Sequence, residues 1–213
     1  MKLLVNPILD PQTIVRGQWN REPAQKLYIQ RVWKYLKGRR ELPNLRIDRP
    51  PPNSKLMPTI GDLEEFNRQF PPEGEMDAIS VDIENAGQHI ICIGFTAFHS
   101  GGNIGSSVCV RFRKRGGGLW HKHRELVQVV TWLFDILRMD SISKVFHNGV
   151  TYDVPILQEL GFQVGGRLID TLNLQHCVYP EDKKGLQYCS TLYNWSPAWK
   201  TLVEEEDEEE GKG

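Results

Sequence analysis

The clearest hydrophobic pattern in the chain lies in residues 79–87, which read Ile-Ser-Val-Asp-Ile-Glu-Asn-Ala-Gly. Apolar residues at 79, 81 and 83 alternate with polar residues at 80, 82 and 84, and this period predicts a β-strand. The same period puts Asp82 and Glu84 on one face, about 7 Å apart along the strand. Two carboxylates this close repel each other, and a divalent cation would offset the repulsion. Taken alone, the pattern fits an amphipathic strand with a hydrated polar face equally well.

The remaining pattern predicts a mixed α/β protein. Apolar positions recur with helical spacing in residues 124–139, and shorter helices are expected at 59–70, 151–161, 172–178 and 185–193. Strands are expected at 89–98, 107–113, 144–146 and 167–171, the first of them buried on both faces because it is almost entirely apolar. Three strands followed by strand–helix alternation predict a mixed β-sheet flanked by helices.

Composition divides the chain into three parts. Residues 1–58 form a basic N-terminal extension. It contains a predicted helix at 23–37, and a proline-rich linker forms its C-terminal part. Residues 59–200 form the main domain, and residues 201–213 an acidic tail that we expect to be disordered. Lys34, Arg39 and Arg40 are candidates for contacts with nucleic-acid phosphates, although a solvated helix face explains them as well.

Charge and cysteine usage add little about function but bear on location. The chain has 26 basic and 27 acidic residues; without the acidic run 204–210 and Lys212 the counts are 25 and 20, so the body is mildly basic. The cysteines form no C-x-x-C pair and are expected to be reduced and mostly buried. No apolar run is long enough to span a membrane, and the start lacks the apolar segment of a secretory signal. We expect an intracellular, cytoplasmic protein, in a host cell if it is viral.

A second acidic motif lies in residues 147–155, His-Asn-Gly-Val-Thr-Tyr-Asp-Val-Pro. Asp153 falls in the first turn of a predicted helix, where a carboxylate also interacts favourably with the helix dipole, and this is the alternative explanation for it. The combination is more informative than either part. A pair of acids on a strand, followed about 70 residues later by an Asn-Gly turn and an acid at a helix start, favours a functional site.

These two motifs resemble those of the DEDD 3′–5′ exonucleases. Residues 82–87 are similar to the first motif of that family, Asp-x-Glu-Thr-x-Gly, with Asn85 in place of Thr, and residues 148–153 are similar to the second. The flanking segments 116–120, 170–171, 179–181 and 184–186 resemble the proofreading exonuclease domain of bacteriophage family A DNA polymerases. The resemblance covers about residues 59–200.

The resemblance implies an RNase H-like fold and phosphodiester hydrolysis with two Mg²⁺ or Mn²⁺ ions. Asp82 would bridge both ions, Glu84 would bind the ion that activates water, and Asp153 would hold the second ion. Asn148 and His147 would lie beside the terminal nucleotide, although a structural hydrogen bond would explain His147 equally well. The implied function is removal of nucleotides from single-stranded DNA 3′ ends, by a module of, or a partner to, a DNA polymerase.

One element of the family pattern is missing. The third motif, Tyr-x-x-x-Asp or His-x-x-x-x-Asp, has no match, and the nearest acid, Glu181, follows Pro180 in a predicted loop. We therefore expect the fourth carboxylate to be absent and activity to be weak. The alternative function is a weak or inactive exonuclease-like domain that binds nucleic-acid ends or a partner protein. Trp132 and Phe134 are expected in the core rather than as stacking platforms for bases.

Overall fold

The computed structural model describes residues 53–70, 76–87, 89–113 and 122–194. These residues fall into two compact units, and the boundary between them in the sequence lies between Thr171 and Leu172. The first unit contains a sheet with strand order β1-β4-β3-β2-β5-β6. Its strands are β1 (Ser54–Lys55), β2 (Ala78–Ala86), β3 (His89–Phe98), β4 (Ile104–Arg111), β5 (Ser143–Phe146) and β6 (Leu168–Asp170). Its helices are α3 (Ile60–Asn67), α4 (His123–Arg138) and α5 (Asp153–Glu159). The second unit contains most of α6 (Thr171–Val178) and all of α7 (Leu186–Asn194).

The directions of the strands identify the fold. β2, β3 and β4 form an antiparallel meander, whereas β5 and β6 continue the sheet parallel to β2 on its other side. β2 is therefore the central strand, and the sheet is mixed. This six-stranded mixed sheet flanked by helices is RNase H-like and confirms the predicted fold class.

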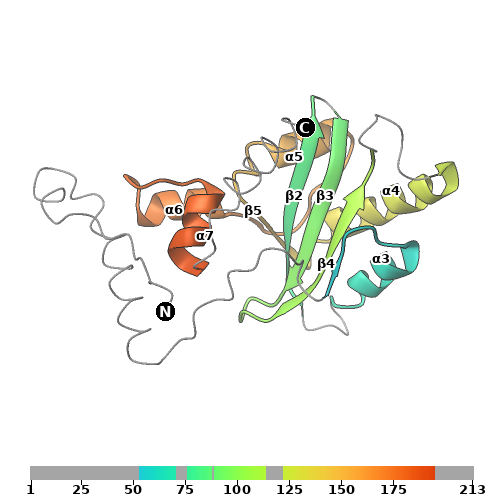
Figure 1. The fold of residues 1–213 in the computed structure, drawn as a ribbon, viewed down its shortest axis with the longest axis horizontal. Coiled ribbons are helices and arrows are strands. Elements are labelled where there is room, and N and C mark those ends of the chain that lie inside the picture. Colours follow the sequence, from blue (N-terminus) through green and yellow to red (C-terminus); the bar gives the residue numbers. More distant parts are fainter. Residues whose placement is uncertain (1–52, 71–75, 88, 114–121, 195–213) are drawn as a thin grey trace, which may run out of the picture. The chain divides into compact units, whose positions relative to one another are not determined.

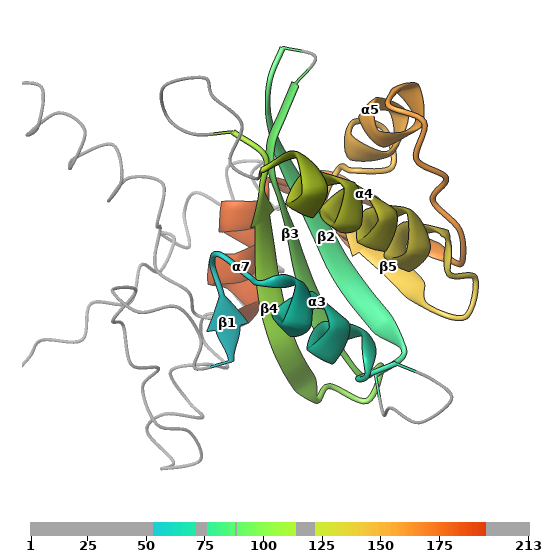
Figure 2. The same cartoon turned by 90° about the vertical axis from the view of Figure 1, so that its right-hand side faces the viewer.

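The core lies on one face of the sheet. Helices α3 and α4 cover that face over β2, β3 and β4 (Figure 2). From Cys92 to Phe98 the buried positions of β3 alternate with half-buried ones, and His89 and Ile91 are exposed, so the prediction that this strand is buried on both faces was wrong. The opposite face of β3 includes Gly94, which has no side chain, and the polar Thr96. The apolar residues that alternate with them made the whole segment look continuously hydrophobic in the sequence.

Trp132 joins α4 to α3 and the sheet. Its indole Nε1–H donates to the Leu63 carbonyl oxygen and the Asn67 side-chain oxygen, each at 3.0 Å. Its ring packs edge-on against Phe95, with ring centroids 5.4 Å apart. Trp132 is buried, as predicted. Phe134 is 38% exposed, although its ring packs against Phe162 with ring centroids 4.6 Å apart, so its assignment to the core was wrong.

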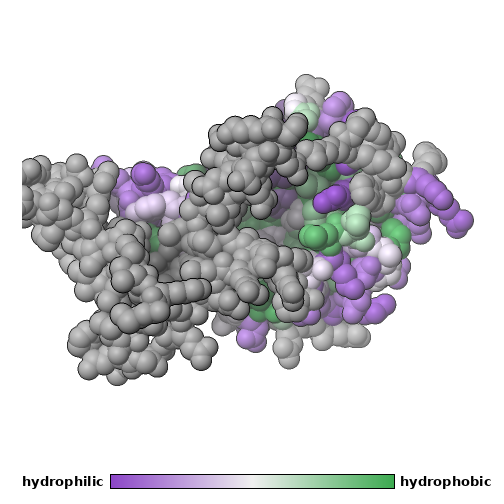
Figure 3. All heavy atoms as spheres, in the orientation of Figure 1, coloured by the Kyte–Doolittle hydropathy of each residue, from purple (hydrophilic) through white to green (hydrophobic). Residues whose placement is uncertain are grey.

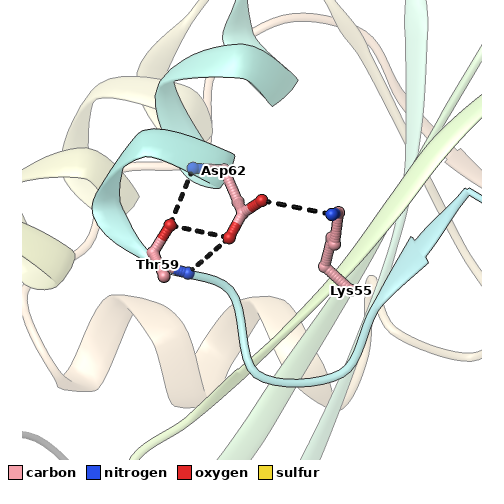
Figure 4. A network of polar contacts seen from close by, with 3 residues as sticks. All are labelled: Lys55, Thr59 and Asp62. Carbon is pink, nitrogen blue, oxygen red and sulfur yellow. Dashed lines mark hydrogen bonds and ion pairs between the residues drawn. The ribbon is translucent and has the colours of Figure 1, made fainter.

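Helix α3 begins at a capping box formed by Thr59 and Asp62. The Thr59 hydroxyl accepts a hydrogen bond from the Asp62 amide, and the Asp62 carboxylate accepts one from the Thr59 amide at 2.8 Å (Figure 4). The Thr59 hydrogen bonds are also the main reason that the pKa of Asp62 is lowered. Lys55 of β1 forms an ion pair with Asp62 at 3.4 Å, which links α3 to the edge of the sheet.

The remaining predictions concern the cysteines and membrane-spanning helices. Hydrophilic residues cover most of the coloured surface on the right of Figure 3, with a small hydrophobic patch among them. All four cysteines are free thiols, but Cys177 is exposed and the others are only half-buried, so the prediction that they are mostly buried was wrong. Within the part of the chain that the structure describes, no helix is long and apolar enough to cross a bilayer. The predicted helix 23–37 and the acidic tail lie outside the described residues.

Candidate active site

Strand β2 presents two carboxylates on the face of the sheet that lies away from the core. Val81 and Ile83 are buried at 3% and 5% exposure, whereas Asp82 and Glu84 are exposed. This arrangement follows directly from the alternation in the sequence, because successive side chains of a strand point to opposite faces. The hydrophobic residues anchor the strand, and the two acids remain accessible from solvent.

The second acidic motif reaches β2 where its neighbour ends. The ladder between β2 and β5 stops at Ser80 and Val145, so the backbone of β2 beyond Ser80 has no β5 partner. Asp153, at the start of α5, fills part of this gap: its Oδ1 accepts a hydrogen bond from the Ile83 amide at 3.1 Å. Figure 1 shows α5 beside the upper part of β2. This bond brings Asp153 to the residue that lies between Asp82 and Glu84.

The turn that carries Asp153 is fixed by Asp170 at the end of β6. The Asp170 carboxylate is buried and accepts hydrogen bonds from the Asn148 amide (2.9 Å) and the Val150 amide (3.1 Å). Asn148 has a φ of 66°, which non-glycine residues rarely adopt. Two hydrogen bonds to a carboxylate stabilise a turn of this kind. Asp170 is thus a supporting residue of the site, and no local sequence pattern reveals this role.

A second contact joins the motifs at the surface. The Tyr152 hydroxyl donates to the Asn85 side-chain oxygen at 3.1 Å, and the Asn85 amide group donates to the Gly87 carbonyl oxygen at 2.9 Å. Asn85 is the residue that departs from the family motif. The start of α5 is therefore linked to β2 by two hydrogen bonds, a buried one to Asp153 and a solvent-exposed one from Tyr152.

The site is strongly acidic. Burial raises the pKa of the Asp153 carboxyl, and the charges of Asp82 and Asp170 raise it further, while the hydrogen bond from the Ile83 amide opposes them. A hard cation would relieve this repulsion, and the oxygen donors present suit Mg²⁺ or Mn²⁺. Among residues 53–70, 76–87, 89–113 and 122–194, however, no group of three or more His, Cys, Asp or Glu side chains is placed to hold a metal ion. The donor chemistry fits such an ion, but the described residues do not bring three such ligands together.

The other predicted site residues have different surroundings. The His147 Nδ1 forms a hydrogen bond with the Thr171 hydroxyl at 2.8 Å, and its Nε2 is buried without a hydrogen-bond partner in the described structure. Asn148 is exposed, and its side-chain oxygen accepts from the Thr151 hydroxyl at 3.0 Å. His147 thus has the structural bond that the sequence left as an alternative. Lys34, Arg39 and Arg40 lie outside the described residues.

Glu181, the acid nearest to the missing motif, and its neighbour Asp182 belong to the second unit. Glu181 is exposed in the segment that joins α6 to α7. Both carboxylate oxygens of Asp182 lie 2.8 Å from the Tyr188 hydroxyl, and one also accepts from the Lys183 amide. Asp182 therefore stabilises the start of α7 in this unit.

Comparisons with known proteins give distant likenesses. No protein-family model matches the chain, and no curated protein sequence does. Among solved structures, Brucella melitensis NrnC matches with a TM-score of 0.41 and 19% identity over 68% of this chain and 63% of its own. The Escherichia coli RNase D, an exoribonuclease involved in structured RNA processing, has a TM-score of 0.42 and 21% identity over 66% of this chain and 33% of its own. The Aedes aegypti Nibbler EXO domain has a TM-score of 0.46 and 11% identity, covering 74% of this chain and 73% of its own.

This chain therefore spans less than two thirds of the length of NrnC and about a third of RNase D.

Proposed function

We propose that this protein is a metal-dependent 3′–5′ exonuclease that removes nucleotides from the 3′ ends of single-stranded DNA, as a proofreading module of, or a partner to, a DNA polymerase. The observation that carries the proposal is the hydrogen bond from the Ile83 amide to Asp153. It joins two acidic motifs that lie 70 residues apart, and a lone amphipathic strand would not require this contact.

The chain's own residues would bind the ions and orient the reactants. Asp82 and Asp153 would hold the divalent ions, and Glu84 would complete the ligand set beside the attacking water. When bound, two such ions would activate water and stabilise the leaving 3′ oxygen. Asp170 and the turn at residues 148–150 would keep Asp153 in place, and exposed Asn148 would lie next to the terminal nucleotide.

A second candidate function has support of its own. Without three assembled ligand side chains in the described residues, the domain would bind ions weakly and hydrolyse slowly. A domain of this kind would still bind nucleic-acid ends or a partner protein. The two candidate functions differ in whether the nucleic acid is shortened in the presence of a divalent ion.

The test is incubation of the full chain with 5′-labelled single-stranded DNA, with single-stranded RNA in parallel, in Mg²⁺, in Mn²⁺ and in EDTA. We expect a ladder that shortens from the 3′ end, disappears in EDTA and is lost in Asp82→Ala and Asp153→Asn. The matched control is Asp135→Asn, which neutralises an acid on α4 that is paired with Arg138 (2.9 Å), and it should leave the ladder unchanged.

Three results would contradict the proposal. Internal fragments released from a circular substrate would indicate an endonuclease. Hydrolysis of RNA alone would exclude DNA proofreading. Binding of DNA ends without hydrolysis in either ion would favour the second candidate.

A further inference from the structure

The face of the sheet that carries Asp82 has a gap next to that residue. The strand register places Gly94 of β3 directly opposite Asp82, and Cys109 of β4 opposite Gly94. The neighbouring row on the same face consists of Ser80, Thr96 and Ser107. Small side chains therefore extend from the acidic site across two strands, and the position next to Asp82 has no side chain.

A hollow of about 330 Å³ lies over this gap. Its lining runs from Ser80 and Asp82 across Gly94 to Cys109. It ends at residues 54–56, which comprise β1 and the residue that follows it. This volume falls at the lower end of the range for pockets that hold small molecules, about 300–1,000 Å³. The hollow is continuous with the candidate active site because Asp82 belongs to both.

The backbone gives no reason for a glycine at position 94. Gly94 is not among the residues with positive φ, and a Cβ built on it would meet only the Asp82 carbonyl oxygen, at an ordinary 3.9 Å. A glycine inside a strand is unfavourable, and it often marks a place where a ligand or another backbone approaches closely. A larger side chain at this position would extend into the hollow.

The lining is mostly uncharged. The Thr96 and Ser107 hydroxyls form a hydrogen bond with each other at 2.9 Å. Lys55, the only Lys or Arg among the described lining residues, is paired with Asp62. Such a surface suits a neutral, flat group better than a phosphate.

We propose that this hollow binds the nucleobase of one of the last two nucleotides at the 3′ end, and that Gly94 keeps the space open for it. The inference rests on the proposed function, which brings the scissile phosphate to Asp82. The base of a nucleotide next to that phosphate would then lie over β3. Selectivity at this position would come from the shape of the hollow and not from charge.

The test combines two variants with two kinds of substrate. Gly94→Leu fills the hollow, Gly94→Ala fills it in part, and the control Gly61→Leu adds the same side chain at an exposed position of α3, on the other side of the sheet. Substrates are 5′-labelled oligonucleotides, either intact or lacking the base at the last or the next-to-last position. Binding is measured by fluorescence anisotropy with Ca²⁺, and hydrolysis by gel with Mn²⁺.

We expect the wild-type protein to bind an intact 3′ end about tenfold more tightly than one of the abasic ends, which corresponds to about 1.4 kcal/mol. Gly94→Leu should lose this preference while keeping the wild-type melting temperature, and Gly94→Ala should lose part of it. Gly61→Leu should keep it.

The remaining outcomes overturn the inference in distinguishable ways. Hydrolysis by the wild type with no preference between intact and abasic ends, or a preference that Gly94→Leu retains, would exclude the hollow but leave the exonuclease assignment standing. A lower melting temperature of Gly94→Leu with unchanged binding would mean that another part of this chain fills the hollow. Failure of the wild type to bind or shorten any oligonucleotide would refute the proposed function, and this inference with it.

Discussion

The Tyr152 hydroxyl donates a hydrogen bond to the side-chain oxygen of Asn85, 67 residues earlier in the chain, at 3.1 Å. Tyr152 immediately precedes Asp153, and Asn85 immediately follows Glu84. The bond therefore ties together the two short segments that carry the candidate metal ligands. It lies at the surface, since Tyr152 is 50% exposed.

We predict that Tyr152→Phe slows single-turnover hydrolysis severalfold while changing the free energy of unfolding by less than about 1 kcal/mol, because an exposed hydrogen bond contributes little to stability. Asn85→Thr should have a similar effect. If the two side chains act through each other, the double variant should be no slower than either single one. Additive effects would show that the residues act separately.

The close approach of Gly149 to Asp153 gives a second prediction. A Cβ on Gly149 would lie 2.6 Å from the Asp153 Oδ2 and 2.5 Å from the Phe146 ring. Gly149→Ala should displace Asp153, abolish hydrolysis and destabilise the protein by about 1–3 kcal/mol in urea unfolding. Gly61→Ala, in the exposed part of α3, is the matched control and should stabilise slightly. Wild-type activity of Gly149→Ala would show that the position of Asp153 is not critical.

Asp170 offers a test of the supporting structure. Its carboxylate accepts two backbone N–H groups of the turn at 148–150, and an asparagine side chain can accept only one of them well. Asp170→Asn should therefore leave one donor unsatisfied and cost about 1–3 kcal/mol in the free energy of unfolding. Hydrolysis should fall as the turn loosens. An equally stable Asp170→Asn would indicate that the turn is held by other contacts.

Lys144 makes stability depend on pH. It is fully buried in β5, its ammonium donates to the Met139 carbonyl oxygen, and burial lowers its pKa to about 8, while the charge of Asp140 acts in the opposite direction. Lysine in an unfolded chain titrates near pH 10.4. Between these values the unfolded chain binds more protons than the folded one, so the free energy of unfolding should rise with pH from about 8 to 10.

Lys144→Met should lack this rise. The difference in unfolding free energy between wild type and variant, measured in urea at pH 7 and pH 10, should change by about 2–3 kcal/mol. Lys183→Met, at an exposed position, should behave as the wild type does. Identical pH dependence in all three proteins would mean that Lys144 remains charged throughout.

The expectation that the fourth carboxylate is absent predicts a preference among metal ions. With ligands from Asp82, Glu84 and Asp153 alone, hydrolysis should be slow in Mg²⁺ and partly restored by Mn²⁺, which tolerates imperfect oxygen sites better. Glu181→Gln, Asp182→Asn and truncation after Val203 should not change the rate. A rate within the usual range of about 1–10³ s⁻¹ that is lost in one of these variants would identify the fourth acid.

Much of the fold could be predicted because burial leaves a periodic signal. The alternation at 79–84 located β2 and the outward face of Asp82 and Glu84, and the apolar stripe from Leu126 to Leu137 located α4. The alternation did not predict β1, since two residues are too few for a period and their pairing with β4 depends on a segment about 50 residues away. Phe134 was placed in the core because its residue type is usually buried.

The candidate site was less accessible to this reasoning. The combination of the two acidic motifs favoured a functional site, but only the family resemblance implied that Asp153 acts together with Asp82 and Glu84 of β2. The bonds made by Asp170 and Tyr152 join side chains to groups 20 or more residues away, and such contacts leave no trace in the spacing of residues. Sequence patterns report which face is buried, whereas a site depends on which segments meet.

The early end of the ladder between β2 and β5 also has a consequence for solubility. Beyond Ser80, that side of β2 has no strand partner among the described residues, and an unpaired strand edge can add a strand from another molecule. The Asp153 carboxylate occupies the Ile83 amide, and the negative charges of Asp82 and Glu84 stand on the same stretch of strand. The acids proposed for catalysis thus also discourage self-association, and a variant with all three neutralised should aggregate more readily than the wild type.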